Sequence, residues 1–182
     1  MAKLFTVGHG TRTTEELIAV LQEAGVDVLV DVRRYPGSRR HPHFAREALE
    51  HSLPVAGISY DWRGEALGGR RDPVPGSPNI AWRVDAFRGY ADHMASAEFR
   101  SGLRELEDRA TAGVRQAIMC AETVWWRCHR RLIADTLVAH GHEVIHLGMG
   151  RDSAHELHQA ARRDDRGVLI YDIGVTVPLL DQ

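Results

Sequence analysis

Hydrophobic positions along the chain form short apolar runs of strand length, which alternate with stretches whose apolar residues recur at helical spacing. The runs that predict β-strands are Leu4–Gly8, Val26–Val32, Gly57–Asp61, Gln116–Ala121, Glu143–Leu147 and Gly167–Ile173. The stretches that predict helices are Ala45–His51, Val84–Met94, Ala97–Ala110, Arg130–His140 and Ser153–Ala161. This alternation is typical of a mainly parallel sheet with helices on both faces. We therefore predict one α/β domain over residues 1–182, with about five strands in a Rossmann-like or rhodanese-like layout.

Local signals mark the ends of two helices. Thr13 to Glu16 read as a capping box, which predicts a further helix with its buried stripe beginning at Leu17. Gly141 follows the Arg130–His140 stretch, where a glycine commonly ends a helix. At the other end of the chain, we expect the tail Val175–Gln182 to pair at a sheet edge or with a partner. His155 and His158 are expected to lie on the exposed face of the last helix.

The stretch Gln116–Gly148 is predicted to form a strand, a loop, a helix and a second strand. Its chemically reactive residues gather in the loop, where the strand ends and the helix begins: Cys120, Glu122, Cys128, His129 and Arg130. In parallel α/β sheets, the carboxyl ends of the strands and the amino ends of the helices face the crevice that binds ligands. We therefore place the candidate site in this loop.

The two cysteines of the chain both lie in this loop. A thiol at a helix N-terminus beside His and Arg is shifted toward thiolate, which makes it a nucleophile or a soft metal ligand. Cys128 fits this description best, so we predict that it has the lower thiol pKa and that Cys120 is more buried. Either Cys120 attacks the substrate and Cys128 resolves the product, or the two share a metal ion with a histidine.

Two other predicted strands end in polar residues that would face the same crevice. His9 lies between two glycines after the first strand, and glycines allow the backbone to approach a ligand closely. Asp31 and Arg33 end the second strand. A buried carboxylate must be paired or functional, and the simplest pairing for Asp31 is a salt bridge with Arg33 or Arg34.

Two loops carry basic residues. Arg34–Phe44 is predicted to be irregular because of its prolines and glycine. It contains Arg34, Arg39, Arg40 and His41 with Tyr35 and Phe44 interleaved, which is the pattern in this chain that most resembles a nucleic-acid contact. Trp62–Asn79 is too long and too rich in Gly and Pro for an ordinary connection, so we expect a lid, with the Gly68 to Arg71 segment over the site.

Several of these segments together resemble the domain of unknown function 488 family. The matching motifs are Val7–Gly10, Asp31–Arg33, Tyr60, Leu67–Gly69, Cys120–Glu122 and Cys128–Arg130, within roughly Phe5 to Gly148. The two cysteine motifs are the most specific part. The family has no assigned function, and its shared cysteines are similar to those of enzymes.

The chain is also similar, more weakly, to rhodanese-type sulfurtransferases. The segment that ends in Asp31–Arg33 resembles their helix and second strand, and that likeness would give Cys120 the persulfide-carrying position. The loop after Cys120 is longer than the rhodanese cradle, and it carries the bulky Trp125 and Trp126 where small residues are expected. Sulfur transfer is therefore not the function that we favour.

Composition limits the class of protein. The chain of 182 residues is 43% hydrophobic and 26% charged, which is ordinary for a globular domain, and its net charge of −2 gives no global attraction to nucleic acid. Of the 23 Lys and Arg residues, Lys3 alone is lysine, and guanidinium groups bind phosphate and carboxylate through a two-pronged contact. The sequence has no long apolar segment, no leader segment and no glycine-rich nucleotide motif, so we expect a cytoplasmic location, no membrane contact and no nucleotide cofactor.

We predict a thiol-dependent enzyme, a transferase or hydrolase, that acts on an anionic small molecule bearing phosphate or carboxylate. The nucleophile is Cys120 or Cys128. His129 or His9 serves as the base or as the cation that maintains the thiolate, and Glu122 serves as the orienter or general acid. Asp31 completes the predicted catalytic set. The predicted substrate-binding residues are Arg33, Tyr35, Tyr60, Gly68, Gly69, Arg70 and Arg130.

Two alternatives remain open. The first is a nucleic-acid-binding or processing protein that uses the Arg34–Phe44 loop. The second is a metal-binding protein built on Cys120, Cys128 and a histidine. The C-x7-C-H spacing is not a recognised zinc pattern, and a fourth ligand would have to come from elsewhere.

Overall fold

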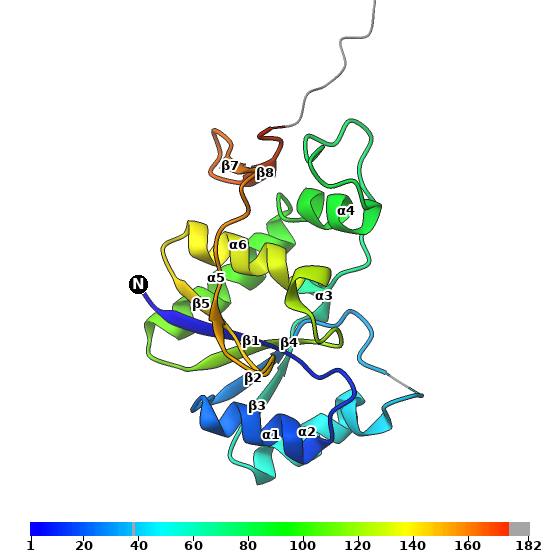
Figure 1. Cartoon of the computed structure of the whole chain (residues 1–182), viewed down its shortest axis with the longest axis vertical. Helices are drawn as coiled ribbons and strands as arrows, with labels where there is room; N and C mark the ends of the chain where they lie inside the picture. The colour runs from blue at the N-terminus through cyan, green and yellow to red at the C-terminus, as the bar shows by residue number, and fades with distance from the viewer. Residues whose placement is uncertain (38, 175–182) are drawn as a thin grey trace, which may run out of the picture.

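The computed structural model describes residues 1–37 and 39–174, and a six-stranded sheet lies at the centre of this part of the chain (Figure 1). Its strand order is β3-β2-β4-β1-β5-β6. The strands are β1 Lys3–Gly8, β2 Val28–Asp31, β3 Ser59–Trp62, β4 Gln116–Cys120, β5 Glu143–His146 and β6 Ser153–Ala154. Strands β1 to β5 pair in parallel, and the short β6 pairs antiparallel with β5. The predicted mainly parallel α/β fold is confirmed.

Helices cover both faces of this sheet (Figure 1). They are α1 Thr14–Glu23, α2 Arg46–Val55, α3 Gly64–Leu67, α4 Asp85–His93, α5 Ala97–Thr111 and α6 Arg130–Ala139, and the short 3-10 helices η1 Pro42–Phe44 and η2 Trp125–Arg127 lie in loops. Helices α1 and α2 pack against one face, where Leu21 and Leu53 share a core with Leu29 of β2. Helices α3 to α6 pack against the other face, where Leu103 and Leu132 share a core with Val30 of β2.

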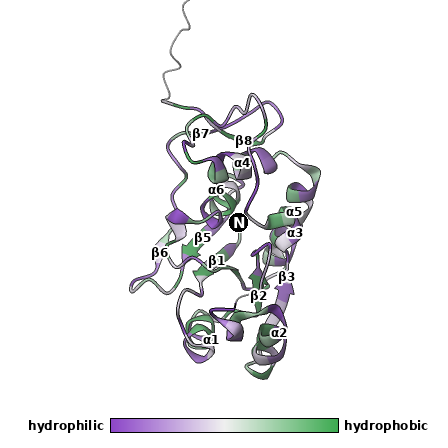
Figure 2. Ribbon diagram, turned by 90° about the vertical axis from the view of Figure 1, so that its right-hand side faces the viewer, coloured by the Kyte–Doolittle hydropathy of each residue, from purple (hydrophilic) through white to green (hydrophobic). Residues whose placement is uncertain are grey.

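Adjacent residues of a strand contribute to opposite cores because strand side chains alternate between the two faces. Leu29 and Val30 show this alternation in β2, and both are fully buried. Figure 2 shows β1, β2 and β5 as hydrophobic, whereas the edge strand β3 is hydrophilic. Strands that are covered on both faces read as nearly continuous apolar runs, which is why the sequence pattern located them.

The helix-end signals behave as predicted. The Thr13 hydroxyl accepts a hydrogen bond from the Glu16 amide at 3.2 Å, and the Glu16 carboxylate accepts one from the Thr13 amide at 2.8 Å, which completes the capping box of α1. Gly141 has a φ of 91° at the end of α6, a left-handed conformation that favours glycine. Helix α2 runs longer than predicted, because Leu53 is buried one turn after Leu49 and holds the additional turn in the core.

The last part of the chain was predicted wrongly. Residues 153–161 form no helix: β6 takes the first two residues, and β7 Ala161–Arg163 pairs antiparallel with β8 Leu169–Tyr171 in a small separate sheet. His155, expected at the surface, is buried because its Nε2 donates to Asp135 of α6 at 2.9 Å. Asp135 also accepts the backbone amide of His158 at 2.9 Å, so these buried hydrogen bonds hold the segment extended. The tail Val175–Gln182 lies outside the described residues.

The predicted lid Trp62–Asn79 begins with structure that the sequence did not indicate. Helix α3 occupies Gly64–Leu67, and Leu67 is fully buried in the core beneath α5. The irregular chain that follows brings Gly69 and Arg70 to the carboxyl edge of the sheet, where they line a cavity.

Candidate thiol site

The carboxyl ends of the central strands meet at one edge of the sheet. Gly8 of β1 lies beside Cys120 of β4, and Asp31 of β2 lies beside Met119. The His9 amide donates to the Cys120 carbonyl at 3.0 Å, which ties the two following loops together. The predicted meeting of His9, Asp31 and Cys120 at one sheet edge is confirmed.

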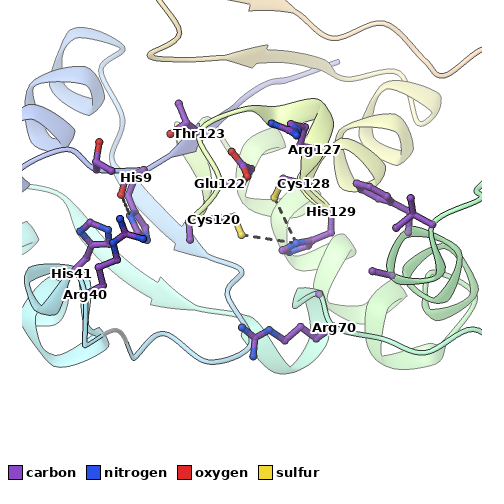
Figure 3. A pocket seen from close by; sticks show the side chains of 17 residues that line it. His9, Arg40, His41, Arg70, Cys120, Glu122, Thr123, Arg127, Cys128 and His129 are labelled. Atoms are coloured by element: carbon purple, nitrogen blue, oxygen red, sulfur yellow. Dashed lines mark hydrogen bonds between the residues drawn. The ribbon is translucent and has the colours of Figure 1, made fainter.

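A cavity of about 800 Å³ opens at this edge (Figure 3). Residues from four loops line it, among them His9, Arg40, His41, Gly69, Arg70, Cys120, Glu122, Thr123, Arg127, Cys128 and His129. Among the described lining residues, Glu122 is the only carboxylate, against the guanidinium groups of Arg40, Arg70 and Arg127. The cavity therefore suits a negatively charged ligand.

The two thiols converge on one imidazole. His129 Nδ1 lies 3.7 Å from Cys128 Sγ and 3.9 Å from Cys120 Sγ, as the dashed lines in Figure 3 show. The other ring nitrogen, Nε2, donates to the Val32 carbonyl at 3.2 Å, which leaves Nδ1 directed at the sulfurs. Gly69 packs so closely on the ring that a Cβ there would lie 2.9 Å from Nδ1. His129 is thus held in place to exchange a proton with either thiol.

The two thiols differ in protonation. The pKa of Cys128 is lowered well below its usual range, first by its interaction with the Cys120 thiol; burial opposes this shift, and the charges of His129 and Arg130 add to it. The pKa of Cys120 is raised well above its usual range, first by its interaction with Cys128 and then by burial. The pair therefore carries its negative charge on Cys128, as the sequence predicted from its position before α6.

The predicted order of burial is wrong. Cys128 is 5% exposed, whereas Cys120 is half-buried. Cys128 lies beneath the η2 turn, where Arg130 Nε donates to its sulfur at 3.4 Å. Cys120 ends a strand and faces the cavity. The thiol with the raised pKa is therefore the more accessible of the two.

Arg130 lies behind the site. Its side chain is 1% exposed, and its guanidinium also donates to the carbonyls of Glu122 and Thr123. These contacts fix the loop that joins the two cysteines. Within the described part of the chain, Arg130 lines neither the large cavity nor the smaller one beside it, so the predicted role of substrate clamp is corrected to that of a buried support.

Asp31 is paired within the protein. It is fully buried and accepts hydrogen bonds from Arg33 Nε at 2.9 Å, from Arg33 Nη2 at 2.6 Å and from the Tyr60 hydroxyl at 2.7 Å. Burial, followed by the Asp31 charge, raises the pKa of Tyr60. Asp31 thus forms the salt bridge expected from the sequence, and the Tyr60 hydroxyl donates to Asp31 instead of lining either of the described cavities at this edge.

His9 is the neighbour of this ion pair. Arg33 Nη1 donates to His9 Nε2 at 3.3 Å, and His9 Nδ1 donates to the Gly10 carbonyl at 3.0 Å. Burial and the charge of Arg33 lower the pKa of His9 to about 4. His9 is therefore neutral at pH 7, and the alternative in which it supplies a positive charge to the thiols is wrong.

A second cavity of about 190 Å³ adjoins the first. It is lined by Arg33, Arg34 and Tyr35, and it shares Gly69, Arg70, Cys120, Ala121 and His129 with the larger one. Arg70 has a φ of 60° and is the non-glycine residue in the described chain with a positive φ. Gly68 lines neither cavity among the described residues, because it packs against the Gly64 carbonyl and Arg34.

Among the cavity-lining residues that sequence reasoning missed are two polar ones, Thr123 and Arg127. The position of Arg127 immediately before Cys128 was the available signal. It also missed why Trp125 is present: this ring stacks on His146 with centroids 4.1 Å apart, and its carbonyl accepts the Cys128 amide at 3.2 Å.

His146 belongs to a buried hydrogen-bonded chain on the α6 face of the sheet. The Thr6 hydroxyl lies 2.7 Å from His146 Nδ1, and His146 Nε2 lies 2.9 Å from His155 Nδ1. His155 in turn donates to Asp135, which also accepts the Tyr171 hydroxyl at 2.9 Å. Each of these ring nitrogens has a hydrogen-bond partner, so the chain gives Trp125 and the thiol loop a rigid support.

The three candidate metal ligands are also close together. Cys120 Sγ, Cys128 Sγ and one ring nitrogen of His129 all lie within 4.8 Å of one another. Two thiolates and an imidazole are a donor set that suits zinc or another soft cation. The site can thus support either thiol chemistry or metal binding.

The fold and this edge define a parallel α/β protein with a paired-thiol site. A family match then covers residues 13–137: the chain belongs to the family described as domain of unknown function DUF488. The rhodanese likeness is not shown by any of these comparisons, since neither a curated protein nor a solved structure matches the chain. Within the described residues, no helix has the length and apolar character needed to cross a membrane.

Proposed function

We propose that this protein is a thiol-dependent enzyme, a transferase or hydrolase, that acts on an anionic substrate. The observation that carries the proposal is the convergence of Cys120, Cys128 and His129 on one wall of a cavity whose charged lining is mainly guanidinium. A thiolate stabilised by a second thiol and by nearby cations is a nucleophile, and arginine binds phosphate or carboxylate in a defined orientation.

The roles follow from the geometry. His129 Nδ1 accepts the proton of Cys128, whose thiolate then forms a covalent bond with the electrophilic atom of the substrate. The bond from that atom to the leaving group breaks, and the leaving group takes the electron pair together with the proton from His129. Arg70 and Arg127 bind the anionic group. Water or a second acceptor then attacks the covalent intermediate and releases Cys128.

The test measures alkylation by iodoacetamide as a function of pH in the wild type, Cys120→Ser and Cys128→Ser. We expect the wild-type reaction to remain fast well below the ordinary thiol pKa of about 8.5, and Cys128→Ser to abolish this fast phase. Inorganic phosphate should slow the reaction of the wild type by occupying the cavity. A fast phase that survives in Cys128→Ser, or a reaction that titrates at the ordinary thiol pKa, would contradict the proposal.

A metal centre is the second candidate function, and the mutual distances of the two sulfurs and the imidazole nitrogen favour it. Such a centre would leave one coordination position open toward the cavity. Elemental analysis of the purified protein tests it directly: near-stoichiometric zinc that is lost in Cys120→Ser and in Cys128→Ser supports the metal. Metal-free protein with fast alkylation that a chelator does not alter supports the enzyme.

A further inference from the structure

The thiols lie between two cavities rather than at the end of one. Cys120 and His129 belong to the lining of both the 800 Å³ and the 190 Å³ cavity, together with Gly69 and Arg70. A ligand that filled only one cavity would leave the other unused. A longer ligand that passed over Cys120 would contact both.

Guanidinium groups stand on both sides of this crossing point. Arg40 and Arg127 line the larger cavity, Arg34 lines the smaller one, and Arg70 lines both. The chain as a whole has a net charge of −2, so the local charge is opposite in sign to the overall charge. This arrangement matches a ligand that carries several negative charges along its length.

An aromatic ring stands beside these charges. Tyr35 is 64% exposed and lines the smaller cavity. The guanidiniums of Arg34 and Arg70 lie 5.8 and 5.7 Å from its ring centroid. Proteins that bind single-stranded nucleic acid combine cations that follow the backbone with aromatic rings on which bases stack.

We propose that the substrate is single-stranded nucleic acid, with its phosphates on the guanidiniums of both cavities, one base against Tyr35 and the reacting nucleotide over the two thiols, within reach of Cys128. This inference rests on the proposed function and names its substrate class. A volume of about 800 Å³ is within the usual range for ligand sites. Because Cys120 is half-buried and Cys128 is buried, a nucleotide must leave the base stack to reach them, which favours an unpaired strand over a duplex.

The test is fluorescence anisotropy with a labelled single strand of about ten nucleotides, a length within known site sizes. Three or four phosphate contacts predict a roughly 20- to 50-fold loss of affinity between about 50 and 200 mM salt. A duplex of the same sequence should bind more weakly.

Variants separate stacking from charge. Tyr35→Leu should weaken binding on the order of 10-fold with an unchanged salt dependence, and Tyr35→Phe should restore most of the affinity. Arg40→Gln should weaken binding and reduce the salt dependence by about one contact. The matched control is Arg104→Gln, an exposed arginine of α5 that lines a different cavity, which should bind like the wild type.

Two outcomes would overturn the inference. If inorganic polyphosphate of equal charge competes as well as the oligonucleotide and Tyr35→Leu binds normally, the surface binds anions without regard to bases. If Cys128 is alkylated rapidly and phosphate protects it, but no oligonucleotide binds, the thiol enzyme stands and its substrate is a small anion.

Discussion

Arg70 offers a test in which stability and function are expected to separate. Its φ of 60° places an exposed arginine in the left-handed region, at the edge of both cavities. For an L-residue this conformation costs roughly 1–2 kcal/mol. Glycine would remove that strain, and the backbone carbonyl that accepts Arg34 Nη1 at 3.1 Å would remain.

The magnitudes can be compared for Arg70→Gly. Relief of the left-handed strain gains roughly 1–2 kcal/mol. The greater freedom of glycine in the unfolded chain costs about 0.5–1 kcal/mol, and loss of the exposed cation–π contact with Tyr35 costs about 0.5–1 kcal/mol. These contributions nearly cancel, so the free energy of unfolding should stay within about 1 kcal/mol of the wild type.

The anion site should respond differently. Urea unfolding measures stability, and the concentration of inorganic phosphate that halves the rate of Cys128 alkylation measures anion binding. We expect Arg70→Gly to need at least about 10-fold more phosphate, because a charge-assisted hydrogen bond contributes about 1.5–3 kcal/mol and about 1.4 kcal/mol is a factor of ten. Arg70→Lys, which keeps the charge, should show an intermediate effect. A stability loss above about 2 kcal/mol, or phosphate protection equal to that of the wild type, would refute the reasoning.

Three further predictions concern the residues around the thiols. Asp31→Asn should lower the free energy of unfolding by about 3–5 kcal/mol in urea titrations, because the buried Arg33 loses its counter-charge. Asp61, whose carboxylate is partly exposed, provides the control. A loss no larger than that of Asp61→Asn would contradict the prediction. Gly69→Ala should slow Cys128 alkylation, because the new Cβ would displace His129. The control Gly37→Ala, which has nothing within 4 Å of its new Cβ, should react at the wild-type rate. Equal alkylation rates in the two variants would show that the close packing at Gly69 is unimportant. Burial lowers the pKa of His9 to about 4 and that of His146 to about 3, both from 6.5. Between the folded and unfolded pKa of each group, the unfolded chain binds more protons than the folded one, so stability should fall on acidification. The fall should be at most about 2.7 kcal/mol per pH unit for the two groups together. Urea midpoints between pH 7 and 4.5 measure the slope, and His146→Phe should reduce it by about one proton; an unchanged slope would show that His146 does not titrate in this way.

Features governed by local sequence or by parallel topology were predictable. The capping box of α1 involves residues three apart, and Gly141 acts on the helix that it follows. The meeting of His9 with Cys120 needed one further assumption, that β1 and β4 are parallel, since parallel strands carry their C-terminal residues to the same edge. The Asp31 ion pair was also accessible, because the partner is two residues away.

Features that depend on distant partners were not predictable. His155 was expected on the exposed face of a helix, but Asp135, twenty residues earlier, holds it in an extended segment. The relative burial of the two cysteines depends on Arg130 and the η2 turn, which cover Cys128. In both cases a buried hydrogen bond across the fold outweighs the local preference, because a buried polar group without its partner is costly.

The loop between the cysteines shows how this site must attract an anion. Its bulky Trp125 argued from sequence against a cradle of backbone N–H groups, and the structure supplies the physical reason. The amides of Arg127 and Cys128 donate to the carbonyls of Val124 and Trp125, and the Val124 amide donates to the Glu122 carboxylate at 3.1 Å. These three amides are therefore already hydrogen-bonded within the loop, and the stacking of Trp125 on His146 holds the loop in this conformation. Guanidinium groups from three separate loops line the cavity and supply positive charge for a substrate, so their removal is the direct test of anion binding.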